Sequence, residues 1–168
     1  MEIKELMKTF RQDGLVERIT VRPERRANVV ELNNVEAAAG LGLQGDRYKG
    51  RGGVRQVTLI QAEHLSAVAS ILGVESIDFT LTRRNILVSG INLLSLKDKD
   101  FRLGEAVLRY SGDCHPCSRM EEAFGPGAYN AMRGHGGITA KVIQSGRISV
   151  GDRLTPIVTE DTEVKSQD

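Results

Sequence analysis

The sequence has 168 residues, 40% of them hydrophobic, which is enough to bury one core and predicts a single domain. Its formal net charge of +1 argues against a broad basic surface for nucleic acid. No apolar run approaches the ~20 residues of a membrane span, and the first residues lack the apolar core of a signal peptide. We therefore expect a protein that binds neither nucleic acid nor membrane.

Residues 1–17 are predicted to form an N-terminal arm, because apolar side chains recur there at helical spacing from Ile3 to Phe10. The folded domain is expected to span residues 18–158. The remaining tail, residues 159–168, is charged and without aromatic side chains, which favours disorder.

Near the start of the domain, the patterns predict two strands, at 16–21 and 28–32. Asn33 or Asn34 can then cap a brief helical turn over 35–39, which stops at Gly40.

The segment Gly40–Arg47 is rich in glycine and ends in an acid and a base. A mobile turn and an anion-binding loop explain this composition equally well, and no Gly-Lys-Ser/Thr closes it as in a P-loop. The next cations, Lys49, Arg51 and Arg55, follow Arg47 without an intervening acid. Such a local excess suits either a phosphate ligand or a solvated loop.

The rest of the domain predicts short strands separated by glycine, with a few helices. Helices are expected over 62–72, 118–124 and 128–132. Strands are expected over 54–60, 86–88, 101–103, 106–110, 138–144, 147–150 and 153–158. Hairpin turns are expected at Gly104-Glu105 and Ser145-Gly146. This pattern favours a mainly β fold, a closed or rolled β-barrel with a few peripheral α-helices.

Three polar residues, Arg83, Arg84 and Asn85, lead directly into the apolar run Ile86–Val88. Polar groups that enter a buried strand need partners, and adjacent arginines repel one another unless an anion joins them. Arginine contacts to phosphate are bidentate and specific. An internal salt-bridge cluster and a site for a ligand phosphate therefore explain this triplet equally well.

Both cysteines of the chain, Cys114 and Cys117, lie between a predicted strand and the predicted helix 118–124. On a strand-to-helix turn, free backbone N–H groups favour a thiolate, which binds soft metals or attacks another sulfur. Two small buried side chains are the alternative, but Pro116 stiffens the loop and favours chemistry. A CxxC pair with no leader segment also favours the reducing cytoplasm.

Three kinds of site compete for these cysteines. A structural zinc site is weakly supported, because the four ligands must come from Cys114, Cys117 and three histidines (His64, His115 and His135). A dithiol oxidoreductase is better supported, because Cys-His-Pro-Cys resembles the thioredoxin motif, although more than a hundred strand-rich residues precede it. The third is a sulfur-liganded cofactor with a phosphate tail, held by arginines.

Five motifs in order resemble the stand-alone MOSC domain, which is named after the C-terminal domain of molybdenum cofactor sulfurase. They are Gly42–Arg47, Arg55–Ile60, Thr82–Ile86, Cys114–Cys117 and Gly134–Gly137. The resemblance extends from about Arg18 to Leu154. It implies a MOSC-type β-barrel that binds a pterin-based molybdenum cofactor or carries sulfur for one.

The resemblance also implies roles for individual residues. Cys117 matches the cysteine that ligates molybdenum or carries a persulfide, whereas Cys114 matches one that many members lack. Arg83 and Asn85 match the pair that binds the pterin phosphate, and Arg84 stands where the reductase members have a different residue. The expected cofactor-binding set also includes Arg47 and Arg133, which lie in the two other glycine-rich loops that carry cations.

Two mechanisms follow from the resemblance. Bound cofactor would reduce N-hydroxylated or related small substrates with electrons from an electron-transfer protein, or Cys117 would carry a persulfide from a cysteine desulfurase. A cofactor-binding module without turnover of its own is the alternative. Pyridoxal phosphate is linked to this chain by family association only, because the desulfurase domain that binds it is absent from these residues.

The two cysteines are not equivalent in sequence. Cys117 directly precedes the predicted helix 118–124 and so lies nearest its unpaired N–H groups, whereas Cys114 follows the carboxylate of Asp113. Local electrostatics and the resemblance therefore both favour Cys117 as the metal ligand or persulfide carrier.

Overall fold

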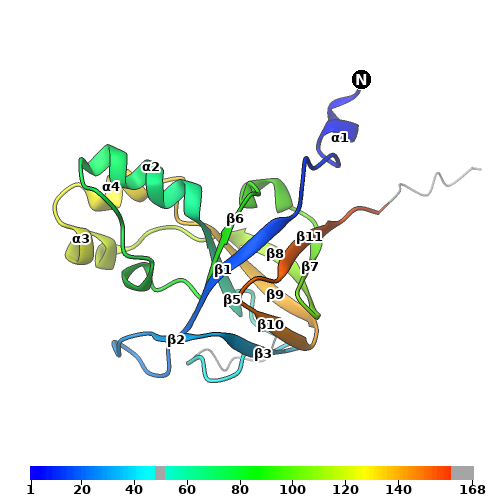
Figure 1. Cartoon of the computed structure of the whole chain (residues 1–168), viewed down its shortest axis with the longest axis horizontal. Helices are drawn as coiled ribbons and strands as arrows, with labels where there is room; N and C mark the ends of the chain where they lie inside the picture. Colours follow the sequence, from blue (N-terminus) through cyan, green and yellow to red (C-terminus); the bar gives the residue numbers. More distant parts are fainter. Residues whose placement is uncertain (48–51, 160–168) are drawn as a thin grey trace, which may run out of the picture.

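The fold is a closed β-barrel, seen in a computed structural model that describes residues 1–47 and 52–159 (Figure 1). In these residues, seven strands form a ring in which each strand is hydrogen-bonded to both neighbours. Their order around the ring is β1 (Gly14–Val21), β11 (Arg153–Ile157), β7 (Asp100–Leu103), β8 (Ala106–Asp113), β9 (Ile138–Gln144), β5 (Val57–Gln61) and β6 (Ile86–Ser89). The predicted mainly β barrel is confirmed.

The barrel closes where its first and last strands meet. Gly14 of β1 pairs with Leu154 of β11 in antiparallel register, and Leu15 pairs with Arg153. Strands β5 and β6 form a parallel pair, and the chain between them contains α2 (Ala62–Leu72). Parallel neighbours need such a crossover, because a tight hairpin can join only antiparallel strands.

Helices cover one end of the barrel, where Figure 1 shows α2, α3 (Ser118–Phe124) and α4 (Ala128–Met132) gathered together. The short helix α1 (Ile3–Leu6) projects from the barrel elsewhere. Two 3₁₀ turns, η1 (Phe79–Thr82) and η2 (Leu93–Leu96), flank β6 in sequence. The bounds of α2, α3 and α4 agree with the sequence prediction.

Two apolar cores hold these layers together. One fills the barrel, and the other lies between its wall and the helices, where Leu65 and Val68 of α2 pack with Met120 of α3. Neighbouring strand residues serve different cores, since Leu59 points into the barrel core and Ile60 into the helix core. Strand β5 is therefore buried on both faces, and none of its five residues is exposed.

The barrel begins earlier in the sequence than expected. Strand β1 starts at Gly14, so the predicted boundary between residues 17 and 18 falls inside a barrel strand. A side chain at Gly14 would collide with Ile91, which shows how closely this residue packs. Gly14 therefore belongs to the barrel rather than ending the arm.

The helical turn predicted over 35–39 is wrong, because these residues form a strand, β3 (Asn34–Ala38). It pairs with β4 (Gly42–Leu43) and β10 (Gly146–Ser149) in a separate small sheet, while β2 (Val30–Leu32) pairs with β1. Val35 and Ala37 are buried and Glu36 between them is exposed. This period of two is the signature of a strand, and it outweighs the helix propensity of the alanines.

The hairpin predicted at Ser145-Gly146 is also wrong. Strand β9 pairs with β5 and β8, whereas β10 pairs with β3. The chain therefore changes sheets at Gly146, where an added side chain would collide with the backbone of Glu105. By contrast, the hairpin predicted at Gly104-Glu105 is confirmed by the antiparallel pair β7 and β8.

None of the helices in the described ranges combines the length and apolar composition that a membrane crossing needs. The tail predicted to be disordered lies, except for Thr159, outside the described residues, as do Lys49 and Arg51.

Candidate functional site

The two cysteines lie on the loop between β8 and α3, as the sequence predicts. Cys114 is 2% exposed, and its backbone N–H donates to the carbonyl of Gly137 at 2.8 Å. Cys117 is exposed, and both thiols are free. The two sulfurs therefore differ in access: only Cys117 can be reached without moving the loop.

Arg84 holds the cysteine loop in place through hydrogen bonds to backbone carbonyls. Its Nε donates to the carbonyl of Gly136 at 2.8 Å, and its Nη2 lies 3.4 Å from the Cys114 carbonyl and 3.3 Å from the His115 carbonyl. The side chain is 7% exposed, and burial lowers the pKa of its guanidinium. In the described part of the chain, its hydrogen bonds all go to neutral carbonyls and no carboxylate pairs with it. A buried cation without an acid favours an anion nearby.

A cavity of about 460 Å³, which we call the arginine cavity, opens beside the loop. Cys117, His115 and Met120 contribute to its wall, and none of the described residues that line it is acidic. Its arginines come from the end of β1, the β4–β5 connection, the segment between η1 and β6, and α3: Arg22 directly after β1, then Arg47, Arg55, Arg83, Arg84 and Arg119. This concentration of cations in a chain of net charge +1 is suited to an anionic ligand.

Arg83 is one of these arginines, and it has an unusual backbone conformation. It ends η1 in the left-handed region, with φ of 61°, and its Nη1 donates to the carbonyl of Ala27 at 3.0 Å. Burial lowers the pKa of its guanidinium, and the nearby Arg119 and Arg22 lower it further. Left-handed geometry is costly for a residue with a Cβ and is concentrated at functional sites. An anion between these side chains would relieve their mutual repulsion.

One carboxylate lies next to the cavity, and it is already paired. Asp46 is buried and accepts hydrogen bonds from the Arg22 backbone N–H at 2.7 Å and from Arg22 Nη2 at 3.0 Å. The Arg47 N–H donates to the Arg22 carbonyl at 2.6 Å. These bonds tie the glycine-rich segment 40–47 to the end of β1 and so place Arg47 in the wall. Of this segment, Arg47 is the residue that lines the arginine cavity.

Asn85 is expected to bind a phosphate, but in the structure its side chain is bonded to residues of two neighbouring strands. Its side chain is fully buried, and Oδ1 accepts from the backbone N–H and the hydroxyl of Thr58 at 3.0 and 3.1 Å. Its Nδ2 donates to the carbonyl of Thr20 at 3.1 Å. Because a backbone N–H only donates and a carbonyl only accepts, the amide orientation is unambiguous. Asn85 therefore joins β6 to β1 and β5 and is not among the residues of the cavity wall.

Arg133 also lies apart from the arginine cavity. It is exposed after α4, outside the set of residues that line the wall. The glycine loop that follows it does contact the site, through Gly136 and Gly137. The 134–137 loop therefore contacts the site through its backbone, whereas Arg133 lies outside the cavity wall.

The sequence prediction missed Arg22 and Arg119. Arg119 is two residues after Cys117, so the turn that presents the sulfur also presents this cation. Arg22 has no local signal of its own. Its partner, Asp46, lies 24 residues away, so the sequence alone does not show that the two side chains form an ion pair.

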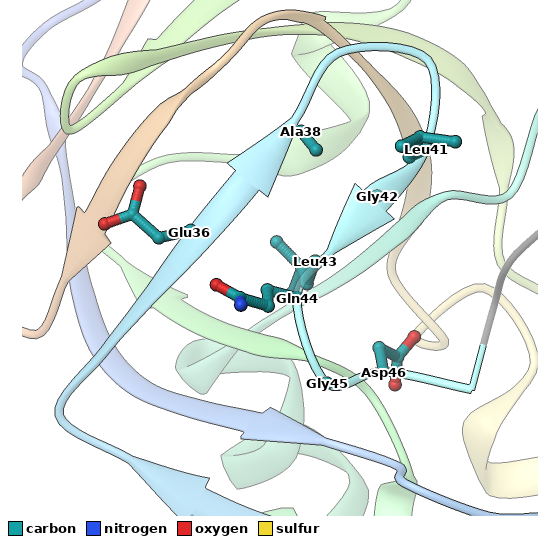
Figure 2. A pocket seen from close by; sticks show the side chains of 8 residues that line it. All are labelled: Glu36, Ala38, Leu41, Gly42, Leu43, Gln44, Gly45 and Asp46. Carbon is teal, nitrogen blue, oxygen red and sulfur yellow. The ribbon is translucent and has the colours of Figure 1, made fainter.

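A smaller cavity of about 330 Å³ lies along β3 and the turn through β4 (Figure 2). Figure 2 shows the carboxylates of Glu36 and Asp46 among its labelled side chains and no cation. Glu36 pairs with Arg147 at 2.8 Å, and Asp46 pairs with Arg22. With an acidic and apolar lining, this cavity does not suit a phosphate.

Two of the three alternatives for the cysteines are weakened by the geometry. A closed barrel excludes a thioredoxin fold. Thr155-Pro156 resembles the proline loop that faces the CxxC motif in that fold, but here Pro156 lies in β11 and pairs with Phe101. The described residues contain no cluster of three or more histidine, cysteine or acidic side chains that could hold a metal, as structural zinc would need. A cofactor that takes one protein thiolate is compatible with this arrangement.

The contact between the cysteine loop and the 134–137 loop predicts a stability effect. A Cβ at Gly136 would collide with the carbonyl oxygen of Cys114. We expect Gly136→Ala to lower the free energy of unfolding by about 2–3 kcal/mol, as for other overpacked sites. Gly134→Ala is the matched control, because a Cβ there meets nothing within 4 Å and has only the cost of φ +80°, about 1 kcal/mol. Equal losses in urea unfolding would contradict the close approach.

Comparisons with known proteins agree with this architecture. The chain resembles the YUAD protein from Bacillus subtilis with a TM-score of 0.77 and 20% identity, over 89% of this chain and 98% of that one. It resembles YiiM from Escherichia coli with a TM-score of 0.69 and 20% identity, over 89% and 71% of the two chains. For YiiM from Geobacillus stearothermophilus the TM-score is 0.66, the identity 18% and the coverage 86% and 75%. These similarities show a shared fold.

No curated protein matches the sequence. The family model described as "MOSC domain" matches residues 46–155, which is more than half of the 168 residues. The matched range contains the cysteine loop and every arginine of the cavity except Arg22. The chain therefore belongs to the MOSC domain family, which is generally linked to the molybdenum cofactor.

Proposed function

We propose that this chain binds a pterin-type molybdenum cofactor in the arginine cavity, with Cys117 as the protein ligand of the metal. One observation supports this most strongly: an accessible sulfur and six arginines line the same cavity, without an acidic residue among the described lining residues. A thiolate is a soft ligand for a transition metal, and guanidinium groups bind phosphate. The metal of such a cofactor would bind the sulfur, and its phosphate would bind the arginines.

The residues present fit this group in size and charge. A volume of about 460 Å³ is within the ~300–1,000 Å³ of small-molecule sites. Arg83, with Arg119 beside it, would hold the phosphate, and the buried Arg84 would keep the cysteine loop in place. Asn85 would act on the ligand indirectly, by fixing the strand that follows Arg83 and Arg84.

When bound, the cofactor would supply two-electron chemistry at its metal. The chain itself binds and orients, because Cys117 and Arg83 lie in one wall. His115 is in the same wall and could donate a hydrogen bond to the substrate. Reduction of an N-hydroxylated substrate consumes two electrons and two protons and releases water, so an electron-transfer protein must supply the electrons.

A second candidate function is sulfur transfer, and the exposure of Cys117 favours it. The Cys117 thiolate would attack the terminal sulfur of a persulfide on a cysteine desulfurase. A new S–S bond then forms on Cys117, and the donor leaves as its thiolate. The same arginines would guide an anionic acceptor to the transferred sulfur. The two candidates differ in what Cys117 holds after purification, which is metal in one and sulfane sulfur in the other.

The phosphate contact can be tested by replacing Arg83 with alanine. We expect cofactor retention to weaken by about 10- to 150-fold, because a charge-assisted contact is worth about 1.5–3 kcal/mol. Pterin fluorescence and metal content after anaerobic dialysis measure the retention. Arg147→Ala is the matched control, since Arg147 is exposed and pairs with Glu36 away from the cavity. Normal cofactor content in a folded Arg83→Ala protein would refute the assignment.

A further inference from the structure

Arg83 and Arg119 line a second cavity as well as the first. This side cavity, about 600 Å³, is formed by residues of the β1–β2 connection, η1 and α3, and includes Asn28, Leu81 and Glu122. Because two arginines belong to both walls, the side cavity adjoins the arginine cavity across their side chains. A guanidinium has five N–H donors, so one arginine can serve ligand groups on both sides.

The side cavity differs from its neighbour in chemistry. Besides the two arginines, it contains carboxylates and an amide, together with apolar side chains such as Val29 and Leu81. One carboxylate, Glu31, is already bonded to Arg18 at 2.6 and 2.8 Å. Such walls suit a ligand with an anionic end and a remainder that carries hydroxyl groups and an apolar face.

Glu122 carries the argument for a ligand with hydroxyl groups. It lies three residues after Arg119 on α3, where opposite charges usually pair. Nevertheless, no ion pair or hydrogen bond involves the Glu122 carboxylate within the described part of the chain. The side-chain amide of Asn28, across the cavity, also makes no hydrogen bond there. An acceptor and an amide are thus both available to a ligand whose anion lies on the arginines.

We propose that the side cavity binds the sugar of a phosphate ester, with the phosphate between Arg83 and Arg119 and the sugar hydroxyls donating to Glu122. Carboxylates bind ribose hydroxyls in this way at nucleotide sites. The ester is either an extension of the phosphate of the cofactor or a separate sugar phosphate or nucleotide. In the first case the inference rests on the proposed function, and in the second it is independent of it.

Calorimetric titration of cofactor-free protein with ribose 5-phosphate, a nucleoside monophosphate and inorganic phosphate tests the proposal. Ribose 5-phosphate should bind about tenfold more tightly than inorganic phosphate, and Glu122→Ala should remove this advantage. The loss of a negative charge affects both probes alike, so their affinity ratio isolates the hydroxyl contact. Glu75→Ala, an exposed carboxylate in another cavity, should leave the ratio unchanged.

Equal affinity for ribose 5-phosphate and inorganic phosphate, or an unchanged ratio in Glu122→Ala, would overturn the proposal. Mass spectrometry of the ligand released by acid from purified protein distinguishes the sources: a nucleotide- or sugar-extended pterin supports the first, a free ester the second. Molybdenum content is measured in parallel on the wild-type protein. A sugar advantage that depends on Glu122 in a protein without molybdenum would refute the proposed function and support the side-cavity proposal.

Discussion

Cys117→Ser should purify without bound molybdenum and without sulfane sulfur. Cys117 is the exposed sulfur in the wall of the arginine cavity, so both candidate functions depend on it. A serine hydroxyl is a hard, protonated group at neutral pH and replaces neither a thiolate ligand nor a persulfide carrier. We expect at least a hundredfold loss of bound metal or sulfur, on the order of 3 kcal/mol. Metal analysis and cyanolysis of sulfane sulfur measure it.

Cys114→Ser is the matched control, and it should lose only part of the ligand. Cys114 is buried, with its sulfur 3.8 Å from Arg55 Nη2, and it is not among the residues that line the arginine cavity. Purification must be anaerobic and free of added thiol, because oxygen would oxidise the two cysteines to a disulfide and a thiol reductant would remove the outer sulfur of a persulfide. Equal and complete loss in the two variants would show a true dithiol site and contradict the ranking.

Asn85→Asp should produce the largest change in stability. The new carboxylate would be buried between Thr58, which donates, and the Thr20 carbonyl, which can only accept. A buried charge left facing an acceptor costs about 3–5 kcal/mol. Burial raises the pKa of such a carboxyl, so the folded state binds the proton more tightly than the unfolded state. The lost stability should therefore begin to return as the pH falls to that raised pKa, and should be regained fully below the ordinary carboxyl pKa of about 4.

Urea unfolding at several pH values measures this effect. Asn92→Asp makes the same chemical change at an exposed position, where the side chain caps η2 by accepting from the Leu94 N–H at 3.2 Å. Asp and Asn cap equally well, so we expect a change within about 0.5 kcal/mol. If Asn85→Asp were as stable as Asn92→Asp but lost cofactor, Asn85 would be a ligand contact rather than a link between strands.

Elements with a complete local signal were predicted accurately from the sequence. Helix α2 has apolar residues at helical spacing and ends at Gly73, whose φ of 68° is the left-handed conformation that glycine tolerates. Helix α3 follows the cysteine loop with its expected bounds, Ser118–Phe124. For these segments, the residues that start and stop the element lie within it or directly beside it in sequence.

Elements whose partners lie far away in sequence were not predictable. Strand β3 is a strand because Val35 and Ala37 pack in the core and its edges pair with β4 and β10, more than a hundred residues away in the latter case. Likewise, Gly146 turns the chain out of one sheet and into another, which a local turn pattern cannot distinguish from a hairpin.

The residues of the site likewise divide into those with a local sequence signal and those without one. The cysteine loop and the Arg83-Arg84 pair were identified locally, but the roles within the triplet 83–85 depend on where each side chain points. Arg83 and Arg84 line the cavity, while Asn85 is bonded inside the barrel wall. Arg22 is placed by its bonds to Asp46, which lies 24 residues away in sequence. The cluster of arginines is therefore assembled by contacts between residues that are distant in sequence, which composition does not show.

The molybdenum content of wild-type protein tests the central claim most directly. The protein would be produced with molybdate, purified anaerobically without added thiol, and analysed for metals, for sulfane sulfur and for pterin fluorescence after oxidation. The account predicts molybdenum and pterin in equal amounts, approaching one of each per chain, both lost in Cys117→Ser. Zinc in place of molybdenum, or a metal-free protein whose only cargo is sulfane sulfur on Cys117, would contradict it.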